Sequence, residues 1–378
     1  MLRSVLSRRF FLAMGAAAGI CSGLPARANV GRLRVALAAP GRQSDPFWQM
    51  SASIMRAAAR DLDIDLIIEW GERDRSQIIA LGEALVDQQP DYLLVVNEYR
   101  TAVPLIQAAQ RRNIPCLLTF SGLMEEDVAM LNNGGGIHYL LGSLMPDNLG
   151  AGRFMARALI ETTRRAGLSR DGKVPLIAIG GARSAVAALD RLAGLYQVLR
   201  ADPAAQLLDE VSVNWSREEA YQRTLALLRR QPQVTAVWAA NDDMALGAMQ
   251  AAIDLGRRPG GDIFFVGLNW QREALDAVAD GRMRLSMGGH FLVGAWALAL
   301  LRDHYDSGQA PITGVREVVK LAVMDRERVA LYRQHFGGGG WERLDYRRFR
   351  QGDAAPGFAV EPLLAQLPPA KPLGDFRG

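Results

Sequence analysis

Short apolar runs alternate along this chain with longer segments in which apolar residues recur at helical spacing. A short, bounded apolar run predicts a buried strand, and the longer segments have the period of an amphipathic helix. Strands that alternate with helices pair in parallel and are covered by helices on both faces of the sheet. In the N-terminal part the pattern predicts strands at 33–39, 65–70, 92–97 and 115–120, and helices at 47–62, 77–88 and 102–112.

A second series of the same kind follows the turn-rich segment 123–137, which contains the run Asn132-Asn133-Gly134-Gly135-Gly136. Two similar series indicate a duplicated, hinged α/β architecture. The later strands are predicted at 139–144, 174–179, 207–213, 234–240, 263–267 and 315–323. The later helices are predicted at 149–165, 186–199, 217–230, from 244 onward, at 291–305 and at 326–335.

The junction between the strand 234–240 and the helix after it carries Asn241, Asp242 and Asp243 in succession. It lies at the carboxyl end of a predicted parallel strand, where open α/β sheets bind ligands. One of the three side chains is expected to cap the helix, because Asn and Asp accept hydrogen bonds from its first N–H groups. Three polar residues exceed what a cap needs, so we expect at least one of them to face a ligand.

Two more strands end at the same predicted edge of the first sheet. Asn97 follows the third strand and Phe120 ends the fourth. Asn97 is the better candidate for a ligand contact, because a polar side chain at this place needs hydrogen-bond partners.

The charge of the chain is concentrated at its start. The formal net charge is +4, and residues 1–28 contain four arginines and no acidic residue, which leaves 40 basic and 40 acidic residues in the remainder. A neutral remainder gives no electrostatic reason to expect a nucleic acid or an anionic membrane as partner. The basic and aromatic stretch after Trp341 is diluted by Glu342 and Asp345, so it does not change this expectation.

Residues 1–28 have the pattern of an export signal: paired arginines, Arg8 and Arg9, then the apolar run 10–20 and an Ala-Arg-Ala cleavage site that ends at Ala28. The sequence SRRFFL matches the twin-arginine pattern, which would export a folded protein to the periplasm. An ordinary secretory signal stays open. A lipoprotein signal at Cys21 is disfavoured because Ile20 is bulky.

The mature part contains a single cysteine, Cys116, which lies in a predicted strand and is expected to be a small core residue. No zinc-ligand spacing is present, and the histidines are scattered. The sequence also lacks a Ser-His-Asp neighbourhood and a phosphate loop, and the adjacent carboxylates of Asp242 and Asp243 are expected to point apart. We therefore expect a protein without cofactor, metal or catalytic activity.

The strand 234–240, the run NDDMALGA, its helix and the strand 263–267 closely resemble the ribose/galactose-type periplasmic binding proteins. The resemblance covers most of the mature chain. It implies the type I periplasmic-binding fold, in which two doubly wound parallel-sheet lobes are joined by a three-crossover hinge and close on a small polar ligand. By this resemblance we expect crossings near residues 124, 289 and 309. The first lobe would be 31–124 with 290–309, the second 125–289 with 310–330, and the C-terminal extension 331–378.

The resemblance also implies a binding loop after the first strand. Family members place such a loop over the cleft, where aromatic rings stack on a sugar and polar neighbours bind its hydroxyl groups. The alternative is a capped helix, with Asp45 as the cap, Pro46 at the first helical position and the aromatic rings in the core. The residues that correspond to the family's loop are Gln43, Ser44, Asp45, Phe47 and Trp48.

Arg191 matches the arginine of the family's R-x-x-G pattern, which reaches the ligand from the second lobe. A guanidinium fork suits vicinal hydroxyl groups or a carboxylate. The alternative is an exposed helix arginine paired with Asp190 or Asp202. Phe120 replaces the polar residue often found at its place in the family, which argues against a heavily hydroxylated sugar.

Three further positions are suggested by the same resemblance. Asn269 and Trp270 follow the strand 263–267, and His290 lies at the last crossing, where relatives place a polar contact. His290 differs from them in residue type, so it stands equally as a ligand contact, a hinge residue or a pH-sensitive element. Trp215 lies in a loop that supplies a polar contact in relatives, although Asn214 beside it is equally suited to cap a helix.

The resemblance implies a monomeric periplasmic solute-binding protein that delivers a sugar-like ligand to an ABC permease in the inner membrane. The alternative is a sensor that reports to a histidine kinase or chemoreceptor. The loop 43–48, Arg191 and the segment after Val323 resemble the quorum-signal receptors of the family, from which Phe120 and Gly289 depart. A LacI-type repressor shares the fold, but here an export signal stands where its DNA-binding helices would be.

Overall fold

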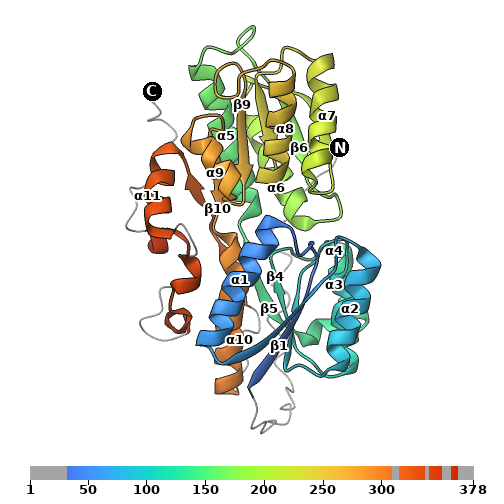
Figure 1. Ribbon diagram of the computed structural model, residues 1–378. Coiled ribbons are helices and arrows are strands. Elements are labelled where there is room, and N and C mark those ends of the chain that lie inside the picture. The colour runs from blue at the N-terminus through green and yellow to red at the C-terminus, as the bar shows by residue number, and fades with distance from the viewer. Residues whose placement is uncertain (1–31, 309–314, 337–339, 351–358, 365–378) are drawn as a thin grey trace. The chain divides into compact units, whose positions relative to one another are not determined.

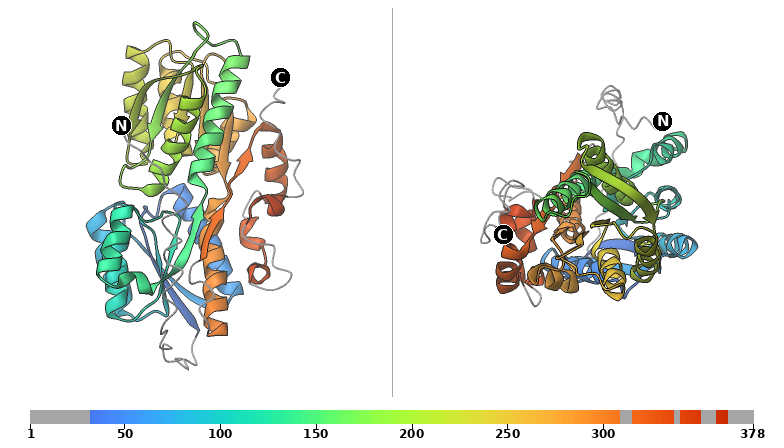
Figure 2. Two further views of the ribbon diagram at one scale, coloured as in Figure 1. Left: turned by 180° about the vertical axis from the view of Figure 1, so that it is seen from behind. Right: turned by 90° about the horizontal axis from the view of Figure 1, so that it is seen from above.

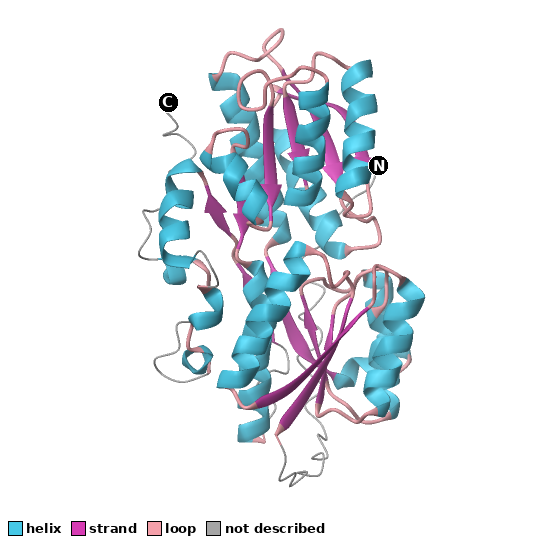
Figure 3. Ribbon diagram, viewed as in Figure 1, coloured by secondary structure: helices cyan, strands magenta, loops and turns pink. Residues whose placement is uncertain are grey.

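The fold is given by a computed structural model that describes residues 32–308, 315–336, 340–350 and 359–364. The predicted export signal and the expected crossing at 309 lie outside these residues. The described strands form two six-stranded sheets, and helices cover both (Figures 1 and 3). Among the described helices, none combines the length and the apolar character that a membrane crossing requires.

The first sheet has the strand order β11-β5-β4-β3-β1-β2, and every pair in it is parallel. All residues of β3 and β4 are buried, which explains why these strands appear in the sequence as unbroken apolar runs. The strands are β1 (Leu33–Ala39), β2 (Ile64–Trp70), β3 (Tyr92–Val95), β4 (Cys116–Thr119), β5 (Leu140–Pro146) and β11 (Val315–Val319). The helices that pack with them are α1 (Pro46–Asp61), α2 (Arg75–Asp87), α3 (Ala102–Arg111), α4 (Glu125–Asn133) and α10 (Val293–Ser307).

The second sheet has the order β12-β10-β9-β8-β6-β7, with only β12 antiparallel to its neighbour. Its strands are β6 (Val174–Gly180), β7 (Ala205–Ser212), β8 (Ala236–Ala239), β9 (Phe264–Leu268), β10 (Leu285–Gly288) and β12 (Ala322–Met324). Its helices are α5 (Asn148–Arg165), α6 (Val186–Ala201), α7 (Arg217–Arg230), α8 (Asp242–Asp254) and α9 (Arg272–Ala279). Two doubly wound sheets of this kind confirm the predicted fold class.

The chain passes between the sheets three times: after β5, between β10 and α10, and between β11 and β12. The expected crossing near residue 124 is wrong, because β5 pairs with β4 in the first sheet instead of opening the second. The turn-rich segment before β5 forms α4, which packs on α3. The predicted strand 315–323 divides at Lys320: β11 extends the first sheet beside β5, and β12 joins the second beside β10.

Beyond β12 the chain forms the helix α11 (Arg326–Phe336) and the short 3-10 helices η4 (Trp341–Arg343), η5 (Tyr346–Phe349) and η6 (Glu361–Leu364). Two further 3-10 turns, η2 (Gly136–Tyr139) and η3 (His290–Leu292), lie before β5 and before α10. The C-terminal elements, red in Figures 1 and 2, run beside β10 and α10 in both views. Their apolar side chains, among them Trp341, Tyr346 and Val360, are buried.

Candidate ligand-binding site

A cleft that is partly open to solvent lies at the carboxyl ends of strands from both sheets. This is the edge at which open α/β sheets bind ligands, because the loops after the strands meet there. From the first sheet's side it is lined by Pro40, Gly41, Asp45, Phe47, Trp48, Arg73, Glu98, Tyr99 and Phe120. From the second sheet's side and the crossing it is lined by Ala187, Arg191, Trp215, Asn241, Asp243, Asn269 and His290.

Aromatic rings form one wall of the cleft. The ring centroids of Trp48 and Phe120 lie 5.2 Å apart in an edge-to-face arrangement, and Phe47 stacks on His290 at 4.6 Å. Trp48 occupies the space beside Gly41, where an added Cβ would lie 2.0 Å from its ring. The wall therefore depends on a glycine at position 41. Flat apolar faces of this kind suit the C–H face of a ring or chain ligand.

Asp45 and Arg73 form an ion pair at the mouth of the cleft. Arg73 donates to Asp45 through Nη2 at 2.8 Å and through Nε at 3.1 Å. Asp45 also accepts the backbone N–H of Arg42 at 2.8 Å, so its side chain makes no helix-cap bond, although Pro46 is the first residue of α1 as the capped-helix alternative requires. Arg73 also donates through Nη1 to the backbone carbonyl of Asn214 at 3.0 Å, which joins the two lobes.

Arg191 is buried, so the alternative of an exposed helix arginine is wrong. Its Nε donates to Asn148 Oδ1 at 2.8 Å and its Nη1 to the Ala240 carbonyl at 2.7 Å. The guanidinium carbon lies 5.6 Å from the centre of the Trp215 ring. Among the described residues its Nη2 makes no hydrogen bond. Burial lowers the pKa of Arg191 to about 10, which leaves the side chain charged at neutral pH.

Close packing of α5 on α6 places this arginine. A Cβ at Gly152 would lie 2.0 Å from the Arg191 carbonyl oxygen, and a Cβ at Gly194 would lie 2.3 Å from the Leu149 carbonyl oxygen. Both positions need glycine, because the two helix backbones approach within the space of a side chain. The glycine of the R-x-x-G pattern thus has a packing role, which fixes the backbone that carries Arg191.

Three buried polar atoms of the cleft residues have no hydrogen-bond partner within the described part of the chain: Glu98 Oε2, Trp215 Nε1 and His290 Nδ1. Burial raises the pKa of Glu98 to about 7. The Trp215 indole N–H lies close enough to the Glu98 carboxyl to favour its charged form, although the two do not meet the geometry of a hydrogen bond, and this contact and the charge of Arg191 offset part of the rise. Burial, and secondarily the charge of Arg191, lower the pKa of His290 well below its usual 6.5. Buried polar atoms normally have partners, so atoms without one in a cleft indicate where a polar ligand binds.

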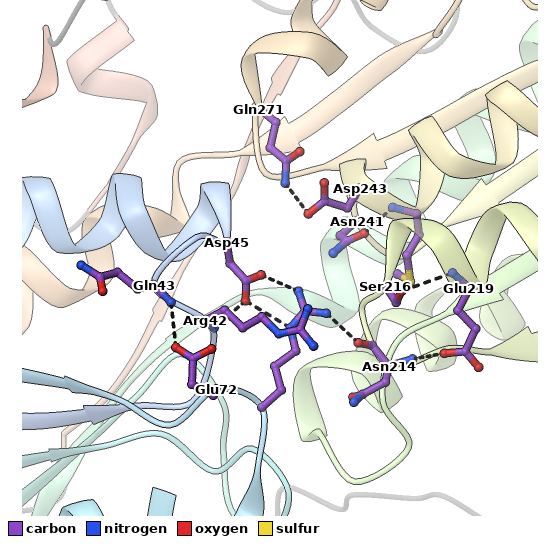
Figure 4. Close-up of polar contacts among 12 residues, drawn as sticks. Arg42, Gln43, Asp45, Glu72, Asn214, Ser216, Glu219, Asn241, Asp243 and Gln271 are labelled. Atoms are coloured by element: carbon purple, nitrogen blue, oxygen red, sulfur yellow. Dashed lines mark hydrogen bonds and ion pairs between the residues drawn. The ribbon is translucent and has the colours of Figure 1, made fainter. Parts of the chain in front are cut away.

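The three polar residues after β8 have different roles: one caps the helix and lines the cleft, one lines the cleft, and one supports the others from behind. Asn241 lines the cleft and also caps α8, because its Oδ1 accepts the Met244 N–H at 2.9 Å. Asp243 lines the cleft and accepts a bond from Gln271 Nε2 at 3.0 Å (Figure 4). Asp242 lies behind them, fully buried, and does not line the cleft.

Asp242 is a supporting residue. It accepts hydrogen bonds from the Gln271 N–H at 3.0 Å and from Ser286 Oγ at 2.8 Å, which ties α8 to the loop after β9 and to β10. Burial raises the pKa of Asp242 to about 7, and these bonds offset part of that rise. The prediction that Asp242 contacts the ligand is therefore corrected to a structural role one layer behind the cleft.

Four other predicted residues also lie outside the lining of the cleft. Gln43 and Ser44 are exposed in the loop before α1. Asn97 is buried, and its Nδ2 donates to the Gly122 carbonyl and to Asp127, both at 2.8 Å, so its amide is already satisfied. Trp270 is buried and donates through Nε1 to the Ser286 carbonyl at 3.0 Å.

Several cleft residues were not among the predicted contacts. Glu98 and Tyr99 follow Asn97 directly, and Arg73 lies beyond the carboxyl end of β2. Tyr99 donates through its hydroxyl to Asn214 Oδ1 at 3.0 Å, a second bond between the lobes. The sequence signal for Glu98 and Tyr99 is their place one and two residues after the predicted contact Asn97, and the signal for Arg73 is its place three residues after the predicted strand 65–70.

The described residues contain no group of three or more His, Cys, Asp or Glu side chains placed to hold a metal ion. A family model described as a periplasmic binding protein domain matches residues 35–310. The chain belongs to this family. A crystal structure of a periplasmic sugar-binding protein from Pseudomonas fluorescens is 31% identical to it, with a TM-score of 0.78, and the match covers 88% of this chain and 99% of that one.

Relatives of the periplasmic binding protein family match over shorter stretches. The xylitol-binding protein of Mycolicibacterium smegmatis is 28% identical over 60% of this chain and 59% of its own length, which is less than two thirds of that protein. The D-apiose import binding protein of Paraburkholderia graminis is 24% identical over 67% of this chain and 74% of its own. A crystal structure of a galactofuranose-binding protein, 19% identical with a TM-score of 0.70, has the same fold.

Proposed function

We propose that this chain is a periplasmic solute-binding protein that captures a small sugar-like ligand in the cleft. The observation that carries the proposal is the combination of partnerless polar atoms with aromatic walls. A hydroxyl group donates one hydrogen bond and accepts others, so it suits both the Glu98 carboxyl and the Trp215 indole N–H. The rings of Phe47, Trp48 and Phe120 suit the apolar C–H faces of the same ligand.

The charges around the cleft favour a ligand without net charge. Arg73 is already paired with Asp45, and the charge of Arg191 is offset by the Glu98 carboxyl across the cleft and by Asp242 and Asp190 of its own lobe. A ligand with a full charge would leave one of these groups uncompensated in a mostly buried site, which is costly. Small neutral molecules with hydroxyl groups on one side and an apolar C–H face for Phe120 on the other avoid this cost, and relatives named for xylitol and D-apiose support the same class.

Delivery to an ABC permease is the role that we propose for the bound form. The names of relatives that import D-apiose and ribose support it. The two bonds that Asn214 receives, from Arg73 and from Tyr99, join the lobes in the arrangement described here, and a permease would recognise the surface that this arrangement creates. Export as a folded protein through the twin-arginine signal is part of the same proposal.

A thermal-shift screen tests the proposed ligand class. The probes are D-ribose, D-xylose, L-arabinose, D-apiose, xylitol, D-allose, D-galactose and myo-inositol, with glutamate and phosphate as charged controls. A probe at about 100 times its Kd adds about 2.7 kcal/mol of stability, which raises Tm by about 3–4 °C in a protein of this size. A shift with a sugar or polyol supports the proposal. A shift only with the charged controls, or with no probe at all, contradicts it.

A further inference from the structure

The residues after β12 form a segment that contacts both lobes. Its described part consists of residues 326–336, 340–350 and 359–364, which include α11, η4, η5 and η6, and we call these residues the C-terminal strap. It lies outside the residues 35–310 that the family model matches. The strap carries several of the largest buried side chains of the C-terminal part, including Arg328 and Tyr346. A merely appended tail would not bury such groups, so the strap is part of the packed structure.

The first part of the strap is anchored on the second lobe. Helix α11 packs on α9 and β12. Arg328 is buried and donates to the Val323 carbonyl at 2.9 Å, and it pairs with Glu361 of η6 at 2.9 Å. Arg333 pairs with Asp276 on α9. These bonds fix α11 and η6 to each other and to the second sheet.

The middle part of the strap is anchored on the first lobe. Glu342 in η4 accepts a bond from Ser53 Oγ on α1 at 2.8 Å. The backbone N–H of Tyr346 donates to Asp61 Oδ2, at the end of α1, at 2.9 Å. The helix η5 also packs on α10. The described elements of the strap are thus fixed to α9 and β12 of one lobe and to α1 and α10 of the other.

The strap also supports the loop after β9. Tyr332 of α11 packs on Trp270, with ring centroids 5.4 Å apart. Trp270 follows the cleft residue Asn269, and both have positive φ angles, 141° for Asn269 and 58° for Trp270. Non-glycine residues adopt such angles only where their surroundings hold them. Tyr332 is one of the groups that hold this turn.

The strap supports the crossing between β10 and α10 in the same way. Val360 lies against Gly289, where an added Cβ would meet Val360 Cγ2 at 2.5 Å. The ring of Trp341 packs on Phe291 at 5.3 Å. Between Gly289 and Phe291 stands the cleft residue His290. The strap therefore packs directly behind two of the residues that line the cleft, without lining it itself.

We propose that the C-terminal strap is a positioning element that holds Asn269 and His290 and stabilises the lobe arrangement that binds ligand. Its anchors on the two lobes fit one relative placement of the lobes, and rotation of one lobe would separate them. Because affinity scales with the population of the competent arrangement, loosening the strap lowers affinity without removing any ligand contact. The affinity part of this inference rests on the proposed sugar-binding function.

Paired valine truncations test the strap. Val360→Ala removes a buried contact with the crossing, and Val86→Ala removes an equally buried valine from α2, in a core cluster without strap residues. Calorimetry uses the probe that gives the largest thermal shift on the unmodified protein. We expect Val360→Ala and Trp341→Leu to weaken its binding at least fivefold, while Val86→Ala stays within twofold despite a comparable loss of Tm. Equal affinities in the strap variants and the control would overturn the proposal.

A second readout does not depend on any ligand. Spin labels on cysteines introduced by Glu83→Cys in α2 and Arg223→Cys in α7, both exposed, report the distance between the lobes by double electron–electron resonance. The native Cys116 is buried and does not compete for the label. In ligand-free protein we expect Val360→Ala to broaden or shift the distance distribution and Val86→Ala to leave it unchanged. Identical distance distributions in the two variants contradict the proposed role of the strap. A screen in which no sugar binds contradicts only the proposed function.

Discussion

At the scale of single residues, Glu98 has the most informative environment of the cleft. Its carboxyl is largely buried, Oε2 has no partner among the described residues, and burial raises its pKa to about 7. In the unfolded chain the ordinary value of about 4.5 applies. Between pH 4.5 and 7 the native protein therefore binds more protons than the unfolded chain, so this group's contribution to stability falls as the pH rises through that window.

We predict that Glu98→Gln flattens part of this pH dependence. Glutamine has the same shape and no charge, so the variant should be more stable than the unmodified protein at pH 8, by on the order of 1–2 kcal/mol, and similar to it at pH 4.5. Denaturant unfolding at the two pH values measures the difference. The pKa of Asp242 is raised as well, so the free energy of unfolding of both proteins still falls to some extent as the pH rises. Parallel pH profiles for the two proteins would show that Glu98 is not buried in its charged form.

Arg191 provides the second prediction at this scale. Arg191→Lys keeps the charge but loses the planar guanidinium group. This group hydrogen-bonds to Asn148 and to the Ala240 carbonyl and leaves Nη2 available for a ligand. We expect at least a tenfold loss of affinity for the best sugar of the screen, measured by calorimetry. Arg229→Lys on the exposed face of α7 is the matched control and should not change affinity. Equal affinities for the two variants would exclude Arg191 as a ligand contact.

The sequence predicted the edge of the sheet correctly but not always the residue. Where the chain turns at the end of a strand, neighbouring side chains point in different directions. After β3 the cleft is lined by Glu98, whereas Asn97 turns inward to hold Asp127. After β9 it is lined by Asn269, whereas Trp270 turns into the core. A sequence pattern places such a pair at the right loop, and only the packing around it decides which member faces the cleft.

At the scale of elements, the start of α8 contains a residue that both stabilises the helix and lines the cleft. Asn241 caps this helix and lines the cleft. We predict that Asn241→Ala lowers the free energy of unfolding by about 1 kcal/mol, because the Met244 N–H loses its acceptor. Asn241→Ser restores the cap and should recover most of this loss. Denaturant unfolding measures both variants, and equal stabilities for Ala and Ser would show that the cap bond contributes nothing.

The existence and type of most helices and strands were predictable, because each buried strand is an apolar run and each covering helix has a helical period. The sheet to which each strand belongs was not predictable from the sequence pattern. β5 contains a mixture of buried and half-buried residues and could extend either sheet by its local pattern. Its pairing with β4 and β11 is a contact between distant parts of the chain, which no local period encodes. The same holds for the division of 315–323 at Lys320.

At the scale of the whole molecule, the repeated βα pattern predicted two lobes, while the C-terminal strap had no comparable signal. Its 3-10 turns are too short to show a period, and its aromatic residues are dispersed between polar ones. Its position became clear only from contacts with α1 and α9, which lie far away in the sequence. The strap thus forms a packed fourth connection between the lobes, in addition to the three crossings.

Export of the whole protein is predicted from residues 1–28. Residues 1–28 lie outside the described structure, so the twin-arginine signal is a prediction from the sequence. We expect replacement of Arg8 and Arg9 by lysine to abolish translocation, because lysine lacks the guanidinium groups that define the motif. Cell fractionation with detection of precursor and mature chains measures this. Normal periplasmic accumulation of the double variant would indicate an ordinary secretory signal instead.

The most direct measurement of the central claim is a crystal structure of the protein with the strongest-binding sugar or polyol of the screen. The account predicts that the ligand lies in the cleft, against Trp48 and Trp215, with hydroxyl oxygens at about 3 Å from Glu98 Oε2 and from the Arg191 guanidinium. A ligand bound at another surface, or a cleft in which these two side chains turn away from the ligand, would contradict it.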